Sequence, residues 1–204
     1  MCIISGLSEG QVLQRQGAAG ATLVLGVADA KGTALKVTIL HRGRALNGWK
    51  GRRVGAVRKG NGLFKLTNIP AGGPYRLRVE AGPRQACEVK VFYVGDVWIL
   101  AGQSNMEGSG RLPGVVRPHP LVRSFSLRRE WRQAVDPLHV QVESPDACHH
   151  GGRQIPRYLG ERLRLRASSG AGAGIAFGHE MLEQSGVPQG LICVALGGSP
   201  LAMW

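Results

Sequence analysis

The segment Ala101–Gly108, with the sequence AGQSNMEG, contains the residue best suited to covalent chemistry. Ser104 follows the apolar run Val97–Ala101, which has the character of a buried strand. In open parallel sheets, ligands bind beyond the carboxyl ends of the strands, and a turn or helix there directs backbone N–H groups at an anion. Gly102 permits the sharp turn that this position needs. Ser104 is therefore well placed for covalent chemistry and is a candidate nucleophile.

The same residues also fit a purely structural role. Ser104 and Glu107 have the spacing of a capping box, in which a serine hydroxyl and a glutamate carboxylate satisfy backbone N–H groups at the start of a helix. Spacing alone does not decide between a helix cap and a nucleophile, so both interpretations stay open at this stage.

The elements around Ser104 have an α/β pattern. Val97–Ala101 and Leu191–Leu196 are apolar without alternation, as expected of strands covered on both faces. Ile175–Ser185 has the pattern of a helix that leads into the second of these strands. Val122–Leu127 is a candidate third strand. A covered parallel sheet usually has more strands than this, so the layer looks incomplete.

The first 95 residues have a different pattern. Leu35–Ile39, Tyr75–Val79 and Cys87–Tyr93 alternate between apolar and polar residues, and Gly, Pro and Asn residues mark turns between them. Six or seven such strands predict a β-sandwich. The expected fold class is α/β: a β-sandwich-like domain over residues 1–95, followed by an incomplete three-layer α/β/α parallel-sheet domain over residues 96–204.

Positive charge is concentrated near the N-terminus. The chain has 26 Lys and Arg against 13 Asp and Glu, a formal net charge of +13, and residues 30–79 contain twelve Lys and Arg but no Asp or Glu. Such a surface attracts polyanions, although charges on alternating strand positions also simply keep a domain soluble. Aromatic residues make up only 5% of the chain and no nucleic-acid motif is present, so nucleic acid is not expected as a partner.

Other composition signals exclude several classes of site. Cys2, Cys87, Cys148 and Cys193 form no C-x-x-C pair, so we interpret them as small core residues and expect no metal and no cofactor. The longest uncharged stretch, Gly190–Trp204, has 15 residues, short of the ~20 that cross a bilayer, so no membrane span is expected. The first residues have no basic leader and no long apolar run, so we also expect no secretory signal.

Several segments resemble one enzyme family. Val97–Met106 resembles the nucleophile block of the sialate O-acetylesterase and acetylxylan esterase group within the SGNH hydrolases. Gly172–Phe177 is similar to the glycine block before that family's helix, and Ala195–Trp204 resembles its Gly-Gly-Thr loop. Gln11–Arg15 and Pro70–Tyr75 extend the resemblance into the β-rich part, so it spans nearly the whole chain.

The resemblance implies a serine carbohydrate esterase that needs no cofactor. Ser104 would attack the acetyl carbonyl of an O-acetylated carbohydrate such as O-acetylated sialic acid. The oxyanion would be held by the N–H of Ser104 and by the Gly197–Gly198 loop, with Gly198 preferred over Gly197. The remaining candidates for substrate binding or loop support are Gln103 and Asn105, expected to brace the turn, together with Gly174 and His149.

The resemblance places the catalytic His, with an Asp three residues before it, in a later segment of the domain. Asp136-x-x-His139 and Asp146-x-x-His149 have this spacing but precede the glycine block, so we interpret both as chance occurrences. The chain is therefore expected to be a truncated esterase, extracellular or periplasmic by resemblance. The alternative is a glycan-binding or accessory fragment that lacks the general base.

Overall fold

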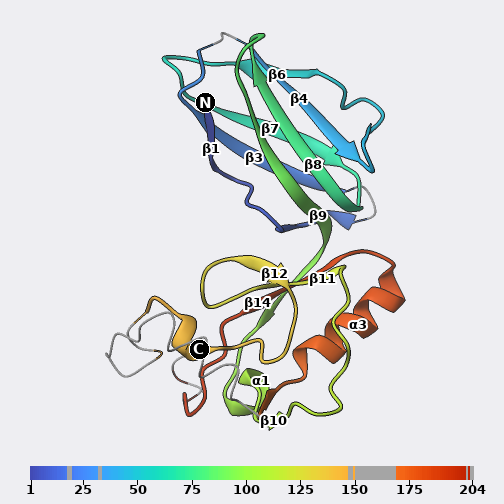
Figure 1. The fold of residues 1–204 in the computed structure, drawn as a ribbon, viewed down its shortest axis with the longest axis vertical. Helices are drawn as coiled ribbons and strands as arrows, with labels where there is room; N and C mark the ends of the chain where they lie inside the picture. Colours follow the sequence, from blue (N-terminus) through green and yellow to red (C-terminus); the bar gives the residue numbers. More distant parts are fainter. Residues whose placement is uncertain (18–19, 32–33, 147–148, 150–168, 201, 203–204) are drawn as a thin grey trace. The chain divides into compact units, whose positions relative to one another are not determined.

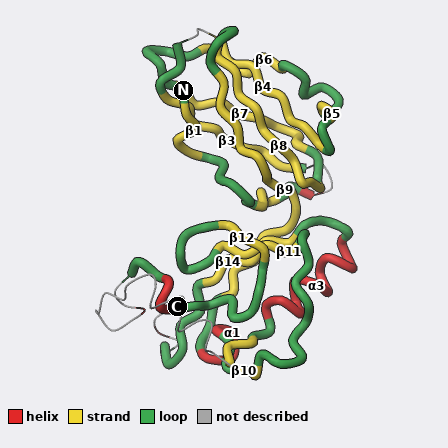
Figure 2. Tube along the Cα trace, in the orientation of Figure 1, coloured by secondary structure: helices red, strands yellow, loops and turns green. Residues whose placement is uncertain are grey.

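The computed structural model describes residues 1–204 except 18–19, 32–33, 147–148, 150–168, 201 and 203–204. The chain forms a strand-rich α/β protein that divides into two compact units, Met1–Asp96 and Val97–Trp204 (Figure 1). The long strand β9, Ala86–Leu100, contributes residues to both units. Strands dominate the first unit and helices occur in the second (Figure 2).

The first unit consists of two sheets. One has the order β1-β3-β7; in the other, β8 lies between β4 and β9, β2 pairs with β9, and both β5 and β6 pair with β4. The strands other than β9 are β1 Cys2–Ser5, β2 Val12–Gln14, β3 Ala21–Ala28, β4 Ala34–His41, β5 Arg44–Ala45, β6 Arg52–Ala56, β7 Gly62–Ile69 and β8 Gly72–Ala81.

The core of the first unit forms between these two sheets. Leu25 of one sheet and Leu77 and Phe92 of the other are fully buried in the same apolar cluster. Along β8 the residues alternate, with Leu77 buried while Arg76 and Arg78 are exposed. The strands that the alternation predicts around residues 35–39, 75–79 and 87–93 are therefore confirmed, because side chains two apart share one face of a strand.

The second unit contains a mixed sheet. Its strand order is β12-β11-β14-β9, with β11 parallel to β14 and antiparallel to β12. Its elements are α1 Ser104–Glu107, β10 Gly110–Arg111, β11 Val122–Phe125, β12 Trp131–Gln133, the 3₁₀ helix η2 Gln141–Glu143, β13 Ser169–Ala171, α3 Gly174–Ser185 and β14 Gln189–Cys193. None of the helices in the described part of the chain has the length and apolarity to cross a membrane.

The antiparallel strand β12 departs from the expected all-parallel sheet. The chain reverses directly after β11, where Ser126 N–H donates to Glu130 O at 2.9 Å and Arg129 N–H donates to Ser126 O at 2.8 Å. A connection this short can only join antiparallel neighbours, because parallel strands need a long crossover. The apolar run at residues 122–127 predicts the first strand but not the return strand.

Helix α3 confirms the helix predicted at residues 175–185 and packs closely on the sheet. It ends where Gly186, at φ +68°, donates its N–H to Leu182 O at 2.8 Å. A Cβ placed on Gly178 would lie 2.8 Å from Val122 Cγ1 and 3.4 Å from Leu191 Cδ1. The helix therefore approaches β11 and β14 at a distance that only glycine allows.

Replacing Gly178 with valine is expected to lower the free energy of unfolding by about 2 kcal/mol, because the added methyl groups overlap Val122 in a close-packed interior. Ala176→Val is the matched control, since residue 176 is exposed on the same helix. Urea denaturation measures both variants. Equal losses in the two variants would show that crowding at Gly178 contributes nothing.

A buried polar network fixes the strand that leads to Ser104. Gln189, which is fully buried, accepts a hydrogen bond from Trp98 Nε1 at 2.8 Å. Its Nε2 donates to Ser185 Oγ at 3.0 Å and to Val187 O at 2.8 Å. Trp98 also packs edge-on against Phe177. These contacts join the end of β9 to the start of β14 and to α3.

The cysteines only partly fit the interpretation as core residues. Cys193 on β14 is buried, and burial raises the pKa of its thiol to about 12. Cys87 is half-buried, whereas Cys2 is exposed on β1, so the expectation is wrong for Cys2. The strand β1 lies at the edge of its sheet, where side chains contact fewer neighbours. Cys148 lies outside the described residues.

Candidate active site

The turn after β9 brings two distant segments together. Gly102 has φ +142°, a conformation that L side chains rarely adopt. Val194 N–H donates to Leu100 O at 3.3 Å, and Leu196 N–H donates to Gly102 O at 2.9 Å. The residue numbers of the donors and of the acceptors both increase by two from the first bond to the second, as they do between parallel strands. The Gly197–Gly198 loop therefore begins beside the turn that carries Ser104.

Ser104 is exposed and is the first residue of α1. The cap residue of this short helix is Gln103, and no side chain caps it by a hydrogen bond. The capping-box interpretation of Ser104 and Glu107 is therefore wrong. Ser104 Oγ forms no hydrogen bond with a described residue, and Ser104 is exposed to solvent.

Glu107 connects α1 to the Gly197–Gly198 loop. Its Oε2 accepts a hydrogen bond from Gly197 N–H. A Cβ placed on Gly197 would lie 2.6 Å from this oxygen and 4.0 Å from Ser104 Cα, so the loop passes close to the candidate nucleophile. Residue spacing does not predict this bond. The capping-box spacing drew attention to Glu107, but its partner lies 90 residues further along the chain.

The two predicted loop donors differ in the structure. The N–H of Gly197 is used by Glu107, whereas the N–H of Gly198 donates to none of the described residues. Gly198 has φ +75°, and Ser199 secures the turn because its Oγ donates to Leu196 O at 2.6 Å. Of the two loop N–H groups, that of Gly197 therefore has an acceptor among the described residues and that of Gly198 has none.

Gln103 and Asn105 were expected to brace the turn, and the described part of the structure shows neither bond. Both side chains are exposed. The turn is instead closed by the backbone, since the N–H groups of Met106 and Glu107 both donate to Gln103 O at 2.9 Å. The amide side chains of Gln103 and Asn105 are thus left facing solvent beside Ser104.

Gly174, a candidate for loop support, packs closely against the end of β9. It is the buried first residue of α3. A Cβ at this position would lie 2.6 Å from Leu138 Cδ1 and 2.7 Å from Leu100 Cδ1. Because Leu100 is the last residue of β9, the absence of a side chain at Gly174 allows the helix to start directly against the strand that ends at the Ser104 turn.

His149 lies beside Ser144 and lines a cavity. Its Nδ1 is 2.5 Å from Ser144 Oγ, while Asp146 Oδ1 accepts a hydrogen bond from Arg129 Nη2 at 2.8 Å. His149, Asp146 and Arg129 line a cavity of about 270 Å³ together with Cys193. Asp146 is therefore paired with an arginine and does not orient His149, although the two have Asp-x-x-His spacing.

His139 lies close to Glu107 but is buried, with 5% of its surface exposed. Neither ring nitrogen has a hydrogen-bond partner among the described residues. Burial lowers the pKa of His139, and the nearby carboxylate of Glu107 opposes this shift. Burial raises the pKa of Asp136, whose Oδ1 likewise has no described partner. Asp136 and His139 therefore form no hydrogen-bonded pair.

The lowered pKa of His139 predicts a loss of stability in acid. Below pH 6.5 the unfolded chain binds a proton at this histidine that the folded protein does not, so the free energy of unfolding falls as the pH drops from 6.5 towards the folded pKa. His139→Gln is expected to reduce the difference in stability between pH 7.5 and 5.5, measured by urea denaturation. His41→Gln is the control. An unchanged difference in the His139 variant would contradict the prediction.

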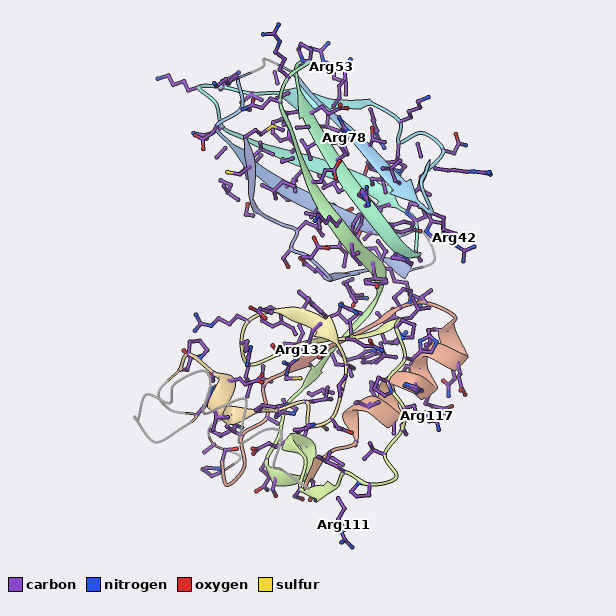
Figure 3. All side chains as sticks on the ribbon, viewed as in Figure 1. Arg42, Arg53, Arg78, Arg111, Arg117 and Arg132 are labelled. Carbon is purple, nitrogen blue, oxygen red and sulfur yellow. The ribbon has the colours of Figure 1, made fainter. Side chains whose placement is uncertain are left out.

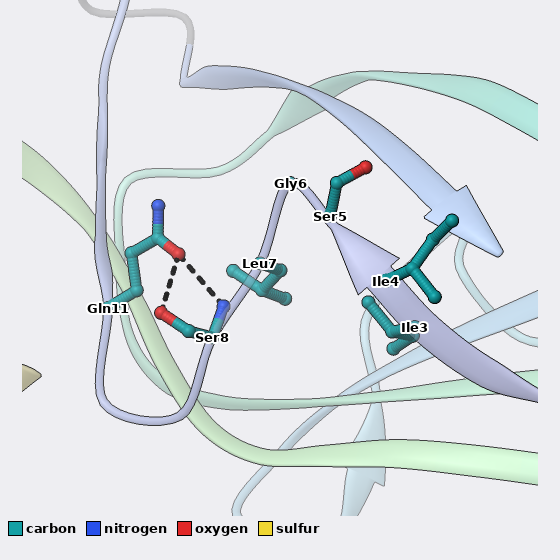
Figure 4. Close-up of a pocket in the computed structure, with 7 residues that line it drawn as sticks. All are labelled: Ile3, Ile4, Ser5, Gly6, Leu7, Ser8 and Gln11. Atoms are coloured by element: carbon teal, nitrogen blue, oxygen red, sulfur yellow. Dashed lines mark hydrogen bonds between the residues drawn. The ribbon is translucent and has the colours of Figure 1, made fainter. Parts of the chain in front are cut away.

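A further cavity lies within the first unit and carries no catalytic chemistry. It has a volume of about 350 Å³ and is lined by residues 3–8 and Gln11 (Figure 4). The N–H and Oγ of Ser8 both donate to Gln11 Oε1, at 2.9 and 3.1 Å. None of its lining residues titrates, and these polar groups already bind each other.

Comparison with known proteins points to one enzyme class. The family described as carbohydrate esterase, sialic acid-specific acetylesterase, matches residues 94–204, more than half of the chain. A probable carbohydrate esterase of Arabidopsis thaliana is 26% identical over 126 residues, covering 53% of this chain and 40% of that protein. The structure of a carbohydrate acetylesterase from Xanthomonas citri is similar in fold, with a TM-score of 0.57 and 24% identity over 97% of this chain and 40% of that chain. The chain thus spans about two fifths of the length of these relatives.

Proposed function

Because this chain belongs to the sialic acid-specific acetylesterase family of carbohydrate esterases, we propose that it hydrolyses acetyl esters on sugars with Ser104 as nucleophile. The observation that supports this most strongly is the placement of Ser104. It is exposed on the turn after β9, and Glu107 ties this turn to a glycine loop. The end of β9 is covered on one face only, because Leu100 is buried whereas Ile99 is 68% exposed, so the expectation of a strand covered on both faces is wrong there.

The proposed reaction has two steps. Ser104 Oγ attacks the acetyl carbonyl, a general base removes the hydroxyl proton, and the sugar oxygen leaves with a proton as the free hydroxyl. Water then attacks the acetyl ester on Ser104, releasing acetate and regenerating the serine. Negative charge develops on the carbonyl oxygen in both steps, so the site must provide hydrogen-bond donors at that point.

The N–H groups of Ser104 and Gly198 are the proposed donors. Neither donates to a described residue, and the parallel pairing of β14 with the end of β9 brings the two segments together. Glu107 is proposed to hold the Gly197–Gly198 loop in place, because its carboxylate accepts a hydrogen bond from the N–H of Gly197. This arrangement presents donors before the substrate binds, which is how such sites lower a barrier.

The general base is proposed to come from residues other than the described histidines. His149 is bonded to Ser144, and His139 is buried with neither ring nitrogen hydrogen-bonded to a described carboxylate. An isolated serine hydroxyl is a weak nucleophile, so the chemistry requires a histidine that reaches Ser104. The family resemblance supplies the candidate, an Asp-x-x-His in a later segment of the domain.

A second candidate function is glycan binding without catalysis. It is supported by the lack of a hydrogen bond between Ser104 Oγ and any described histidine. Both functions are tested by incubating the protein with O-acetylated sialic acid and with acetylated xylan oligosaccharides. Release of acetate supports the esterase and shows which sugar it prefers. Saturable binding without acetate release supports the accessory function. If the protein neither releases acetate nor binds these sugars, both proposals are contradicted.

A further inference from the structure

The first unit carries most of the positive charge of the protein. Residues 1–96 contain fifteen Lys and Arg against five Asp and Glu, so their net charge is +10 of the total +13. The catalytic proposal uses none of these residues. The register of the strands shows where the charge is placed, because side chains two apart on a strand share a face.

Four neighbouring strands place cations on the same outer face of one sheet. Lys36 of β4 is the register partner of Arg53 on β6 and of Glu80 on β8. The next outward positions on β8 are Arg78 and Arg76, and Lys90 lies outward on β9. All five cations are exposed, and Figure 3 shows Arg53 and Arg78 on this unit. We call Lys36, Arg53, Arg76, Arg78 and Lys90 the cationic face.

The two carboxylates on this face, Glu80 and Glu88, offset two of its five positive charges. Arg78 pairs with Glu80 at 3.1 Å and with Glu88 at 3.8 Å. Lys36, Arg53, Arg76 and Lys90 form no ion pair with a described residue. Like charges directly opposite on paired strands destabilise a sheet, and Lys36 and Arg53 are such a pair. A bound polyanion would remove this repulsion.

The surroundings of the cationic face do not favour a polyanion that presents unpaired bases. All five aromatic residues of the first unit are buried: Trp49, Phe64, Tyr75, Phe92 and Tyr93. No described aromatic ring of this unit is therefore available to stack on an unpaired base. Strands lie ~4.8 Å apart, so the face presents about one cation per strand spacing across β6, β4, β8 and β9.

We propose that the cationic face binds an anionic, carboxylate-bearing polysaccharide and so holds the polymer on the enzyme through a surface separate from Ser104. The choice of a carboxylated glycan rests on the proposed function, because sialic acids carry a carboxylate. The existence of the face rests only on the strand register and the ion pairs.

Binding of α2,8-linked polysialic acid without O-acetyl groups tests the proposal, because this probe carries no ester. Titration calorimetry is expected to show binding at 50 mM salt that weakens about 10- to 100-fold at 200 mM, as expected when about four cations displace counterions. Neutral dextran should not bind. Because no acetyl group is involved, failure of this experiment leaves the esterase proposal untouched.

Two matched variants distinguish binding at the cationic face from binding due to the overall positive charge of the unit. Lys36, Arg53, Arg76 and Lys90 are changed to Gln together; the control changes Arg58, Lys59, Lys65 and Arg84 to Gln, which removes the same charge from other exposed positions of the unit. The first variant is expected to lose at least tenfold in affinity and the control less than threefold. Equal losses, or double-stranded DNA binding as tightly as polysialic acid, would overturn the proposal. Thermal unfolding checks that both variants fold.

Discussion

In a protein that includes the proposed Asp-x-x-His segment, Ser104→Ala is expected to lower the turnover number for acetate release by about 10⁶-fold, because removing the nucleophile of a hydrolytic triad leaves only the contribution of substrate binding and the oxyanion donors. KM should change little, since the hydroxyl contributes little to ground-state binding. Release of acetate from p-nitrophenyl acetate and from O-acetylated sialic acid measures the effect in the intact protein.

Ser109→Ala is the matched control for this variant. Ser109 is also exposed and lies five residues further along the chain. It should hydrolyse both esters at the unmodified rate. If Ser104→Ala and Ser109→Ala released acetate equally fast, a different group would have to be the nucleophile.

The second large effect is expected at Glu107. Glu107→Ala removes the acceptor of the Gly197 N–H and should release the loop that carries Gly198. A hydrogen bond to a charged group contributes about 1.5–3 kcal/mol, and each 1.4 kcal/mol corresponds to tenfold in rate. We therefore expect kcat to fall about 10- to 100-fold with KM nearly constant, because the loop acts on the transition state.

Glu107→Gln distinguishes a positioning role from a general effect on stability. Glutamine keeps a side-chain oxygen that can accept from Gly197 and should restore much of kcat. Glu183→Ala, an exposed change on α3, serves as the control and should leave kcat unchanged. A Glu107→Ala variant with normal kcat and a raised KM would contradict the proposed role, as would a loss of kcat that follows only from a lowered unfolding temperature.

Sequence patterns over a few neighbouring residues predicted the strands, helix ends and turns whose conformation depends on those residues alone. The alternation along residues 75–79 identified β8, since one side of that strand faces the core and the other faces water. The glycine after Ser185 identified the end of α3, because Gly186 adopts the left-handed conformation that few other residues tolerate. The sharp turn at Gly102 was predicted for the same reason, and the structure shows its positive φ.

The sequence pattern did not predict contacts between residues that lie far apart along the chain. The bond between Glu107 and Gly197 joins residues 90 positions apart, and its existence depends on β14 lying parallel to the end of β9. The opposition of Lys36 and Arg53 likewise depends on strand register. Nor did the sequence show that Asp146 would pair with Arg129 rather than with His149. Each requires knowledge of which segments become neighbours.

The most direct test of the catalytic proposal is to look for the acetyl group on Ser104. The protein is mixed with p-nitrophenyl acetate, quenched in acid after a few turnovers, digested and analysed by mass spectrometry. The proposal predicts one added acetyl group on the peptide that contains Ser104, and none on that peptide in Ser104→Ala. Steady acetate release with Ser104 unmodified and the acetyl group on another residue would contradict it.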